Sequence, residues 1–600
     1  MYFREDDNFE GHPDEDDESD EDSDVESDEE DVDLSPHGQV YVEMEGLEAP
    51  EHGRNRYADP SRFVFPANEG FEEFTPVTRP IVEYFYLIFP MHFIARILEW
   101  TNARIAATHE LDRHKVDLTK GELMKWIGIR LAMVLSPLRG GIDSYFATTS
   151  ESGTVYEAGN YTKRFGMSRN RFKLILRCLA FGPEDNPNND PWWPIRLFID
   201  AFNARMVKVL IPGTFLCIDE CMSMWKGMSA QIAGIFGIPH QTKIVRKPEG
   251  VGAEFKSIAD VLSGCILMLD LMEGQERNAV KEFNNLGAGI GTTLRMTGPW
   301  HGSNRIVVGD SWFASVLTAY QLWTFGLFFM GIVKTASRFF PKNYLSRWCE
   351  ANNARENRGK YKLLKTQKEG VNIYALGWSD KKGKQVVFTS GTTLPADPSL
   401  RRRHKRVLID GRWVKQVYVK SVPRPSVVKE LFDAFSAIDV HDHLRQGSLE
   451  MEREWITRSW VLRIFGTLLG IIIVNAFNCY LYMMEHVGPQ LDFNTFLGKL
   501  SYELIFNKFL LEEQRVLRSR GLVPPVDEDD QEIHVARLLS LLPEYQYLHN
   551  DGGNRARRRC KICKHKTAWY CIQCSQPPDI IACYCTGNTD RTCFLSHLNA

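Results

Sequence analysis

The sequence predicts a multidomain α+β fold, and three observations support this prediction. The chain has 600 residues, which is too long for a single hydrophobic core. Amphipathic helical stretches fill residues 71–205, whereas short apolar runs separated by turn residues dominate residues 206–348. Residues 556–600 hold seven of the thirteen cysteines. We therefore expect a helical domain, then a strand-rich domain, and finally a small cysteine-rich domain.

Acidic side chains dominate residues 1–36, which we expect to form a disordered tail. Residues 1–35 contain nineteen Asp or Glu and one basic residue, Arg4, and have too few apolar side chains to fold. The formal net charge of the whole chain is −5, but without this segment 71 Lys+Arg face 58 Asp+Glu, a net charge of +13. A basic body suits a phosphate-binding protein.

Three interpretations of the acidic tail stay open. It is a solubilising arm, or a DNA mimic that inhibits the protein by competing for the basic surface. The third is a segment that is charged further by phosphorylation of Ser19, Ser23 and Ser27, which lie in acidic surroundings.

Residues 37–70 are punctuated by Pro and Gly and predict a linker before the helical domain. A later stretch, residues 464–484, is uncharged over about the length that a bilayer requires. Asn475 and Asn478 within it, and Arg463 directly before it, favour a buried helix over a membrane span. The first residues are acidic, so no secretory signal is expected.

Four aspartates stand at predicted secondary-structure junctions. The run TFLCID predicts a buried strand with Asp219 at its C-terminal end. The run RIVVG predicts another strand, with Asp310 where it stops and Ser311 as the cap of the helix that follows. The stretch ELFDAFSAIDVHDHLRQ predicts a helix with Asp439 and Asp442 on one face, because they are spaced i, i+3.

Carboxylates in such positions suit a hard cation such as Mg²⁺ or Mn²⁺. Phosphodiester transfer has a highly charged transition state, and two metal ions about 3.5–4 Å apart can stabilise its attacking and leaving oxygens. The alternative is that these aspartates cap helices or lie on a solvated helical face. Several strands followed by a strand–helix unit also match the order of a ribonuclease-H-like core.

Strand-like runs return in residues 349–430, as KYKLLKT, VNIYALGW and KQVVFTSG, so we expect a β-rich insertion before the Asp439 helix. It ends near SLRRRHKR (399–406). This basic cluster is read as a nuclear localisation signal, a patch for DNA phosphates, or a plain solvated loop.

Cysteines in residues 556–600 have the spacing of zinc ligands. Repeated Cys-x2-Cys in a chain without a signal peptide favours tetrahedral zinc over disulfides. His565 is a spare candidate, and RARRR (555–559) makes the entrance of the segment basic. Eight expected ligands are enough for two Zn²⁺ ions: Cys560, Cys563, Cys571, Cys574, Cys583, Cys585, Cys593 and His597.

Seven sequence blocks, in order, resemble those of piggyBac-type DDE transposases, including transposable-element-derived host proteins. The similarity runs from about residue 75 to the C-terminus. The blocks are MSRNRFKLILRCLAF (167–181), DPWWPIRLFIDAFN (190–203), CIDECMSMWKG (217–227), RKPEGVGAEFKSIAD (246–260), VVGDSWFASV (307–316), GIVKT (331–335) and IDVHDHLRQ (438–446).

This resemblance implies a domain plan around a ribonuclease-H-like catalytic core. Residues 71–205 would serve dimerisation and DNA binding, and the core would comprise residues 206–348 and 431–520, interrupted by the insertion. Residues 521–555 would be a linker to the zinc-binding domain, which would read transposon terminal repeats.

The resemblance also implies the chemistry. Asp219, Asp310 and Asp439, with Asp442 assisting, would hold two Mg²⁺ ions for nicking a transposon end and joining the freed 3′-OH to a TTAA target. A nuclear homodimer bound to DNA is expected. Glu220 is read as a supporting or DNA-contacting residue. Trp460 resembles a family tryptophan near the active site, with a core role equally open.

Two points depart from the family pattern: Ala437 and Ile438 replace the usual glycines before Asp439, and His443 follows Asp442. Two other functions stay open. One is a domesticated, non-cleaving DNA- or chromatin-binding protein, although every expected catalytic Asp is present. The other is a ubiquitin ligase, whose RING domains also bind two zincs. The Cys-x-Cys followed by Cys-x3-His does not fit RING spacing.

Overall fold

The computed structural model consists of two compact units, residues 1–507 and 508–600. The acidic tail lies outside the described residues. The structure describes residues 34–49, 51, 53–71, 74–109, 115–150, 157–244, 247, 249–334, 338–409, 412–519, 536–539, 557–571, 575, 583–584 and 593.

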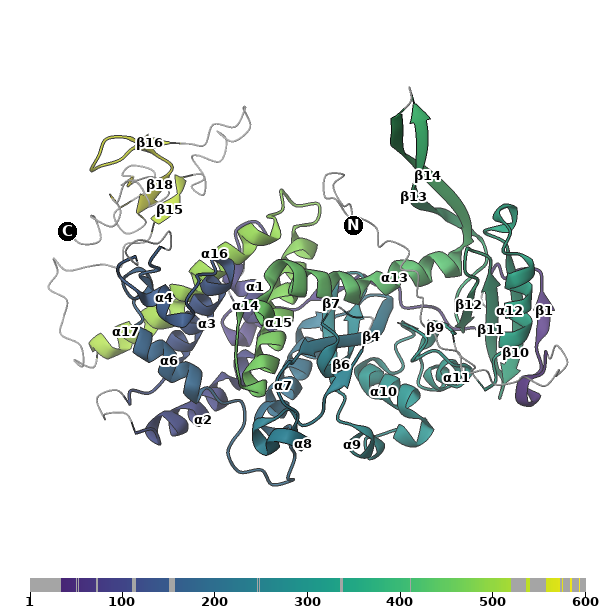
Figure 1. The fold of residues 1–600 in the computed structure, drawn as a ribbon, viewed down its shortest axis with the longest axis horizontal. Helices are drawn as coiled ribbons and strands as arrows, with labels where there is room; N and C mark the ends of the chain where they lie inside the picture. Colours follow the sequence, from purple (N-terminus) through teal and green to yellow (C-terminus); the bar gives the residue numbers. More distant parts are fainter. Residues whose placement is uncertain are drawn as a thin grey trace. The chain divides into compact units, whose positions relative to one another are not determined.

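Ten strands of the first unit form one sheet, whose centre positions the aspartates (Figure 1). At its centre the strand order is β7-β6-β4-β8-β9. β6 is antiparallel to both β4 and β7, whereas β8 is parallel to both β4 and β9. The bounds are β4 (Phe215–Met224), β6 (Val251–Asp260), β7 (Cys265–Leu271), β8 (Ile306–Gly309) and β9 (Phe328–Ile332).

The predicted position of Asp219 at the end of a strand is wrong, because β4 continues to Met224. Pairing with β8 stops at Ile218, but pairing with β6 runs on to Met224 and keeps the backbone extended. The run TKIVRK forms only a two-residue strand, β5 (Thr242–Lys243), among the residues described there.

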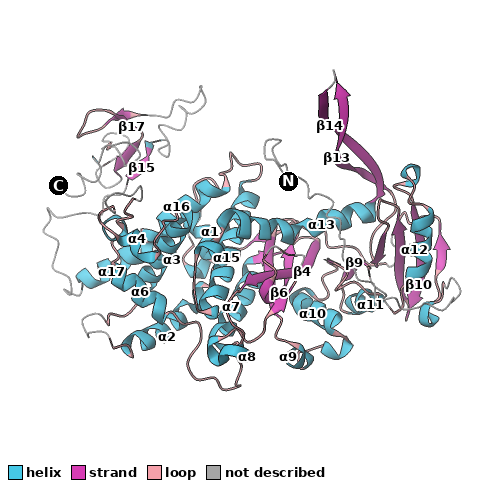
Figure 2. Cartoon of the chain, viewed as in Figure 1, coloured by secondary structure: helices cyan, strands magenta, loops and turns pink. Residues whose placement is uncertain are grey.

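Strands of the predicted insertion extend this same sheet. β12 pairs with β9, and β11, β10 and β1 follow outward. The bounds are β1 (Val42–Met44), β10 (Tyr361–Lys368), β11 (Val371–Trp378) and β12 (Lys384–Phe388). Beyond them, β13 (Pro395–Ile409) and β14 (Arg412–Pro425) form a long hairpin that projects from the unit (Figures 1 and 2).

Helices of residues 71–205 form where the amphipathic stretches predict them. They pack with later helices, chiefly α3 on α16 and α1 on α15. Their bounds are α1 (Ile81–Ile88), α2 (Ile94–Ala106), α3 (Lys120–Leu135), α6 (Arg169–Cys178), α7 (Trp193–Val209), α15 (Trp460–Met484) and α16 (Phe493–Ile505).

The predicted buried helix of residues 464–484 is confirmed as the interior part of α15. α15 is long and apolar enough to cross a membrane, as is the bent pair formed by Ile81–Ile88 and Met91–Ala106, but 83% of the α15 window is buried inside the protein. Asn475 accepts a hydrogen bond from the Ile266 amide (2.9 Å) and donates one to the Ile266 carbonyl (2.8 Å). This buried amide therefore docks α15 onto β7.

Residues 37–70, expected to be a linker, are packed along the core where they are described. β1 forms an edge strand on β10, and β2 (Arg62–Phe63) pairs with β3 (Leu210–Ile211). Arg56 forms a two-pronged ion pair with Glu430. The segment therefore holds distant parts of the unit together.

The second unit contains α17 (Lys508–Ser519) and two small sheets in its described part. β15 (Ala536–Leu538) pairs with β18 (Trp569–Cys571), and β16 (Arg558–Arg559) pairs with β17 (Lys566–Thr567).

Candidate active site

Two of the predicted aspartates meet where β8 ends beside β4. The last parallel pair is Ile218 with Gly309, so Asp219 and Asp310 occupy the next position on the two neighbouring chains. Parallel strands lie about 4.8 Å apart, which brings the two side chains within reach of one cation. Strand register alone therefore brings together Asp219 and Asp310, which are ninety-one positions apart in the sequence.

Glu220 completes a cluster of three carboxylates. One ligand oxygen from each of Asp219, Glu220 and Asp310 lies within 4.8 Å of the others. Burial and the hydrogen bond and charge of Glu220 raise the pKa of Asp219 to about 9. Glu220 is 2% exposed, although the sequence indicated only a supporting role for it. Burial and the neighbouring negative charge thus disfavour the ionised form of Asp219, and the charge of Lys247 opposes this effect.

The third aspartate is carried by α13 (Ser426–His443), which lies along β4. The Cys217 thiol faces the Phe435 carbonyl at 4.0 Å, and the Cys221 thiol faces Asp442 Oδ1 at 3.5 Å. Cys217, Asp219 and Cys221 point to the same face of β4, since side chains alternate along a strand.

Asp439 lies between these two helix contacts, one turn beyond Phe435. Residues three apart share a helix face, so Asp439 lies on the side of α13 from which Asp442 contacts β4. Burial and the charges of Asp219, Asp439 and Asp310 raise the pKa of the Cys217 thiol, so all three carboxylates act electrostatically on this buried sulfur. Asp439 is nevertheless exposed and is outside the 4.8 Å cluster.

Asp442 has different surroundings from Asp439, despite their i, i+3 spacing. Asp442 is buried, and Arg445 Nη2 lies 2.9 Å from its Oδ1. Arg445 also pairs with Glu452 and donates to the Met222 carbonyl at 3.0 Å. Asp442 is therefore part of a buried ionic cluster between α13 and β4.

Lys247 links the two groups of carboxylates, and the sequence did not single it out. Its Nζ donates to the Glu220 carbonyl at 2.6 Å and lies 3.8 Å from Asp442 Oδ2. Burial alone would lower the pKa of Lys247, but the charges of Asp442, Asp219 and Glu220 raise it. Its only sequence signal was its place in the RKPEGVGAEFKSIAD block.

Trp312 and Lys256 flank Asp310 and were also missed. The Trp312 amide donates to Asp310 Oδ1 at 2.9 Å, and its indole is 39% exposed. Lys256 Nζ lies 3.9 Å from the centre of that ring and 2.7 Å from Glu254. A half-exposed aromatic ring beside a cation can stack on a nucleobase.

Ser311 does not cap the following helix, contrary to the prediction. α11 (Val316–Thr324) begins later, and Ser315 caps it by accepting from the Thr318 amide. The intervening turn is fixed by Asp310, whose carbonyl accepts from the Phe313 and Ala314 amides.

Trp460, whose role the sequence left open, is the first residue of α15. It is 5% exposed and packs edge-to-face on Trp192, with ring centres 5.5 Å apart. This placement matches the core role that the sequence left open.

A group of thiols in the second unit matches part of the predicted zinc ligands. Ligand atoms of Cys560, Cys563 and Cys593 lie within 4.8 Å of one another. Burial and hydrogen bonds from Cys563 and Cys560 raise the pKa of Cys593 to about 11. Cys571 and Cys583 are buried outside this group, while Cys574, Cys585 and His597 fall outside the described residues. His565 is exposed, and its Nδ1 lies 2.9 Å from the Cys563 carbonyl.

Comparisons with known proteins bear on the family and on the fold. A family model described as Transposase IS4 matches residues 81–477. A solved cryo-EM structure of a piggyBac transposase synaptic complex with hairpin DNA matches with a TM-score of 0.55 and 18% identity, covering 84% of this chain and 97% of that one. No curated protein matches the sequence. The structural match therefore shows a shared mixed α+β fold.

Proposed function

The chain belongs to the Transposase IS4 family of DDE transposases, and we propose that it cuts and joins the ends of a piggyBac-like DNA transposon. The observation that carries this proposal is the meeting of Asp219 and Asp310 beyond the last β4–β8 pair. Asp439 is carried by α13, the helix that contacts β4, and its charge acts on Cys217 of that strand. The strand order β7-β6-β4-β8-β9 supports a ribonuclease-H-like core. TTAA targets are part of the proposal through the resemblance.

Residues of the carboxylate cluster fit a hard divalent cation. Asp219, Glu220 and Asp310 offer oxygen ligands within 4.8 Å of one another, and burial together with the hydrogen bond and charge of Glu220 raises the pKa of Asp219 to about 9. Mg²⁺ or Mn²⁺ binds such oxygen donors and, when bound, stabilises developing charge on phosphate oxygens. Asp219, Asp310 and Asp439 would hold these ions.

The chain's own residues then have separate tasks. Lys247 fixes the Glu220 backbone and balances Asp442, while the Asp442–Arg445 pair anchors α13 beside β4. Trp312 offers an exposed aromatic contact for DNA next to Asp310, and the buried Lys256 holds that ring from beneath while paired with Glu254. Asp442 thus assists in this proposal by positioning α13 through its ion pair with Arg445.

Thiols of the second unit fit a soft metal such as Zn²⁺. Cys560, Cys563 and Cys593 would contribute to one ion, with His597 as the expected fourth ligand. That leaves Cys571, Cys574, Cys583 and Cys585 for a second ion. This module would read terminal repeats, and the protein would act on DNA as a homodimer in the nucleus.

Asp310→Asn tests the catalytic assignment. This change removes a ligand charge while hardly altering shape, so Mn²⁺- or Mg²⁺-dependent nicking of supercoiled plasmid should fall by about two orders of magnitude or more. Plasmid binding, measured without divalent cation, should be unchanged. Asp433→Asn is the matched control, since Asp433 lies exposed on α13 and pairs with Lys429 and Arg424.

Nicking by Asp310→Asn at the wild-type rate would refute the assignment. A wild-type protein that binds DNA but never nicks it, at any divalent cation concentration, would favour the domesticated alternative instead. If Asp433→Asn loses metal-dependent nicking to the same extent as Asp310→Asn, the loss would point to general destabilisation.

A further inference from the structure

The β13–β14 hairpin carries a concentrated positive charge that the carboxylate site does not use. Its strands pair along their length, from Ser399 opposite Val422 to Ile409 opposite Arg412. Directly opposed residues of an antiparallel pair share a face, and alternate residues return to it. One face, the basic face, therefore carries five cationic residues: Arg401, Arg403, Lys405, Arg412 and Lys420.

The opposite face of the hairpin has a different character. Its cationic residues are Arg402, Arg406 and Lys415, separated by large apolar side chains. Those apolar side chains are exposed: Leu400, Leu408, Trp413, Val417 and Val419. Charge is thus denser and more continuous on the basic face.

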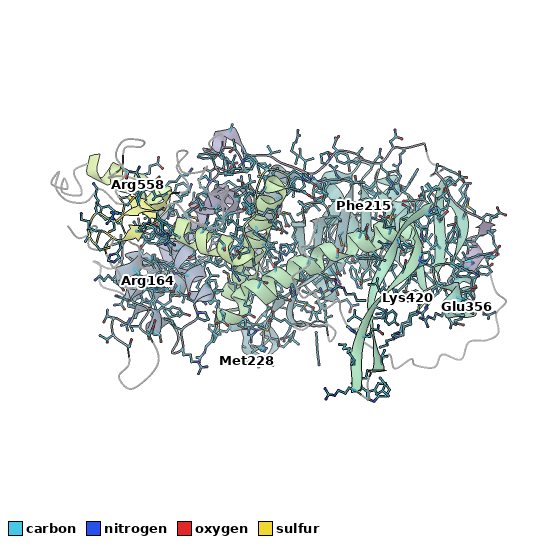
Figure 3. All side chains as sticks on the ribbon, turned by 90° about the horizontal axis from the view of Figure 1, so that it is seen from above. Arg164, Phe215, Met228, Glu356, Lys420 and Arg558 are labelled. Carbon is cyan, nitrogen blue, oxygen red and sulfur yellow. The ribbon has the colours of Figure 1, made fainter. Side chains whose placement is uncertain are left out.

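At the base of the hairpin, cations crowd around one carboxylate. Asp380 is 4% exposed and pairs with Arg401 at 2.7 Å. Burial and the charges of Arg358 and Arg355 lower the pKa of Lys420, and Asp380 offsets this only in part. Figure 3 shows Lys420 on the hairpin near the segment of Glu356, which lies between those two arginines.

A second lysine at this base has the same surroundings. Burial and the charge of Lys334 lower the pKa of Lys384, with Lys382 and Arg401 adding to the effect and Asp380 opposing it. Lys420 Nζ is covered by its neighbours and has no hydrogen-bond partner among the residues that the structure describes. The base therefore holds a surplus of positive charge that an anionic ligand would relieve.

We propose that the basic face of the β13–β14 hairpin and its base bind the phosphate backbone of duplex DNA, as a second DNA site separate from the carboxylate cluster. The choice of DNA rests on the proposed function. From Arg401 to Ile409 the strand spans about 26 Å, at about 3.3 Å per residue. Duplex DNA presents one phosphate charge per about 1.7 Å of axis, so several phosphates lie within this length.

Two matched triple variants of the full chain test the site. The first, Lys405→Gln with Arg412→Gln and Lys420→Gln, neutralises the basic face. The second, Arg402→Gln with Arg406→Gln and Lys415→Gln, removes the same charge from the opposite face. Fluorescence anisotropy would measure binding of a duplex of about 30 base pairs and arbitrary sequence, without divalent cation, over a range of salt concentrations.

The first triple should bind about tenfold or more weakly, and its slope of log K against log salt should be less steep by about 2–3, because each phosphate contact contributes about 0.9. The second triple should keep a slope close to that of the wild type. Equal losses in both triples would overturn the proposal, since only overall charge would matter.

Wild-type binding by the first triple would overturn it as well. The proposal would also be overturned if the first triple lost binding of a poly-glutamate peptide but kept its binding of duplex DNA, because the ligand would then be an acidic polypeptide. Since the assay needs no cleavage, failure of the nuclease assignment leaves this result interpretable.

Discussion

At the residue scale, Asp219 and Asp442 show two ways of handling a buried carboxylate. Asp219 lies beside Glu220 and Asp310, and burial with this neighbouring charge raises its pKa, so a bound cation would favour its ionised form. Asp442 has an internal cation, the Arg445 guanidinium, whose side chain is 1% exposed. The first arrangement favours binding of a ligand, and the second favours stability of the local fold.

Asp442→Asn should therefore lower stability more than it changes metal binding. The substitution leaves the buried Arg445 with Glu452 as its remaining acidic partner, and we expect a loss of about 1–3 kcal/mol in the free energy of unfolding. Asp439→Asn, at an exposed position on the same helix, should change stability by less than about 0.5 kcal/mol. Urea denaturation measures both.

Mn²⁺ binding measured by calorimetry supplies the second half of this comparison. Asp439→Asn should weaken Mn²⁺ binding. Asp442→Asn should lower the amount of bound Mn²⁺ only in proportion to the fraction of protein that is unfolded. Equal destabilisation by the two substitutions would contradict the different environments described for them.

Sequence patterns could identify Asp219, Asp310 and Asp439, because each follows or lies within a recognisable strand or helix. They could not show that Asp219 lies mid-strand, since β6 pairing extends β4 beyond the apolar run. Nor could helical spacing reveal Asp442's ion pair, which depends on burial of Arg445 against Met222. Such tertiary contacts leave no periodic signal.

At the element scale, strand pairing reveals two strands that composition alone did not predict. β13 contains RRRHKR, which lacks the apolar alternation of a half-buried strand, yet β14 pairs with it residue by residue. β9 is a short apolar run that follows α11, and its pairing with β8 and β12 identifies it as a strand. α15, in contrast, was predictable because Asn475 and Asn478 disfavour a lipid environment.

The cysteine-rich module is an element whose fold should depend on metal. We expect two Zn²⁺ ions per chain by elemental analysis, and at most one in Cys593→Ser, because the Cys560–Cys563–Cys593 group loses a ligand. Cys349→Ser is the matched control: it removes a buried thiol of the first unit and should leave the zinc content at two. Mn²⁺-dependent nicking of nonspecific DNA should survive in both.

A wild-type chain with no zinc would remove the basis for this module as a metal-stabilised fold. Two zincs retained by Cys593→Ser would instead show that Cys593 is not a ligand.

At the scale of the whole molecule, negative charge is concentrated in the N-terminal segment, and the rest of the chain is net positive. The chain is formally −5, yet residues 36–600 carry +13, including the basic face of the hairpin. Negative charge tethered to a basic body competes with phosphates for the same surface, and it does so at a high effective concentration. Binding of DNA should therefore depend on whether the acidic segment is present.

Deleting residues 1–35 should strengthen nonspecific duplex binding at low salt, by about tenfold, and the gain should shrink as salt rises because the competition is screened. Anisotropy titrations at several salt concentrations measure this. A full-length variant with its nineteen acidic residues in that segment changed to Asn or Gln should match the deletion, which separates charge from bulk. Unchanged affinity at low salt, in either variant, would show that the tail leaves the basic surface open and acts only as a solubilising arm.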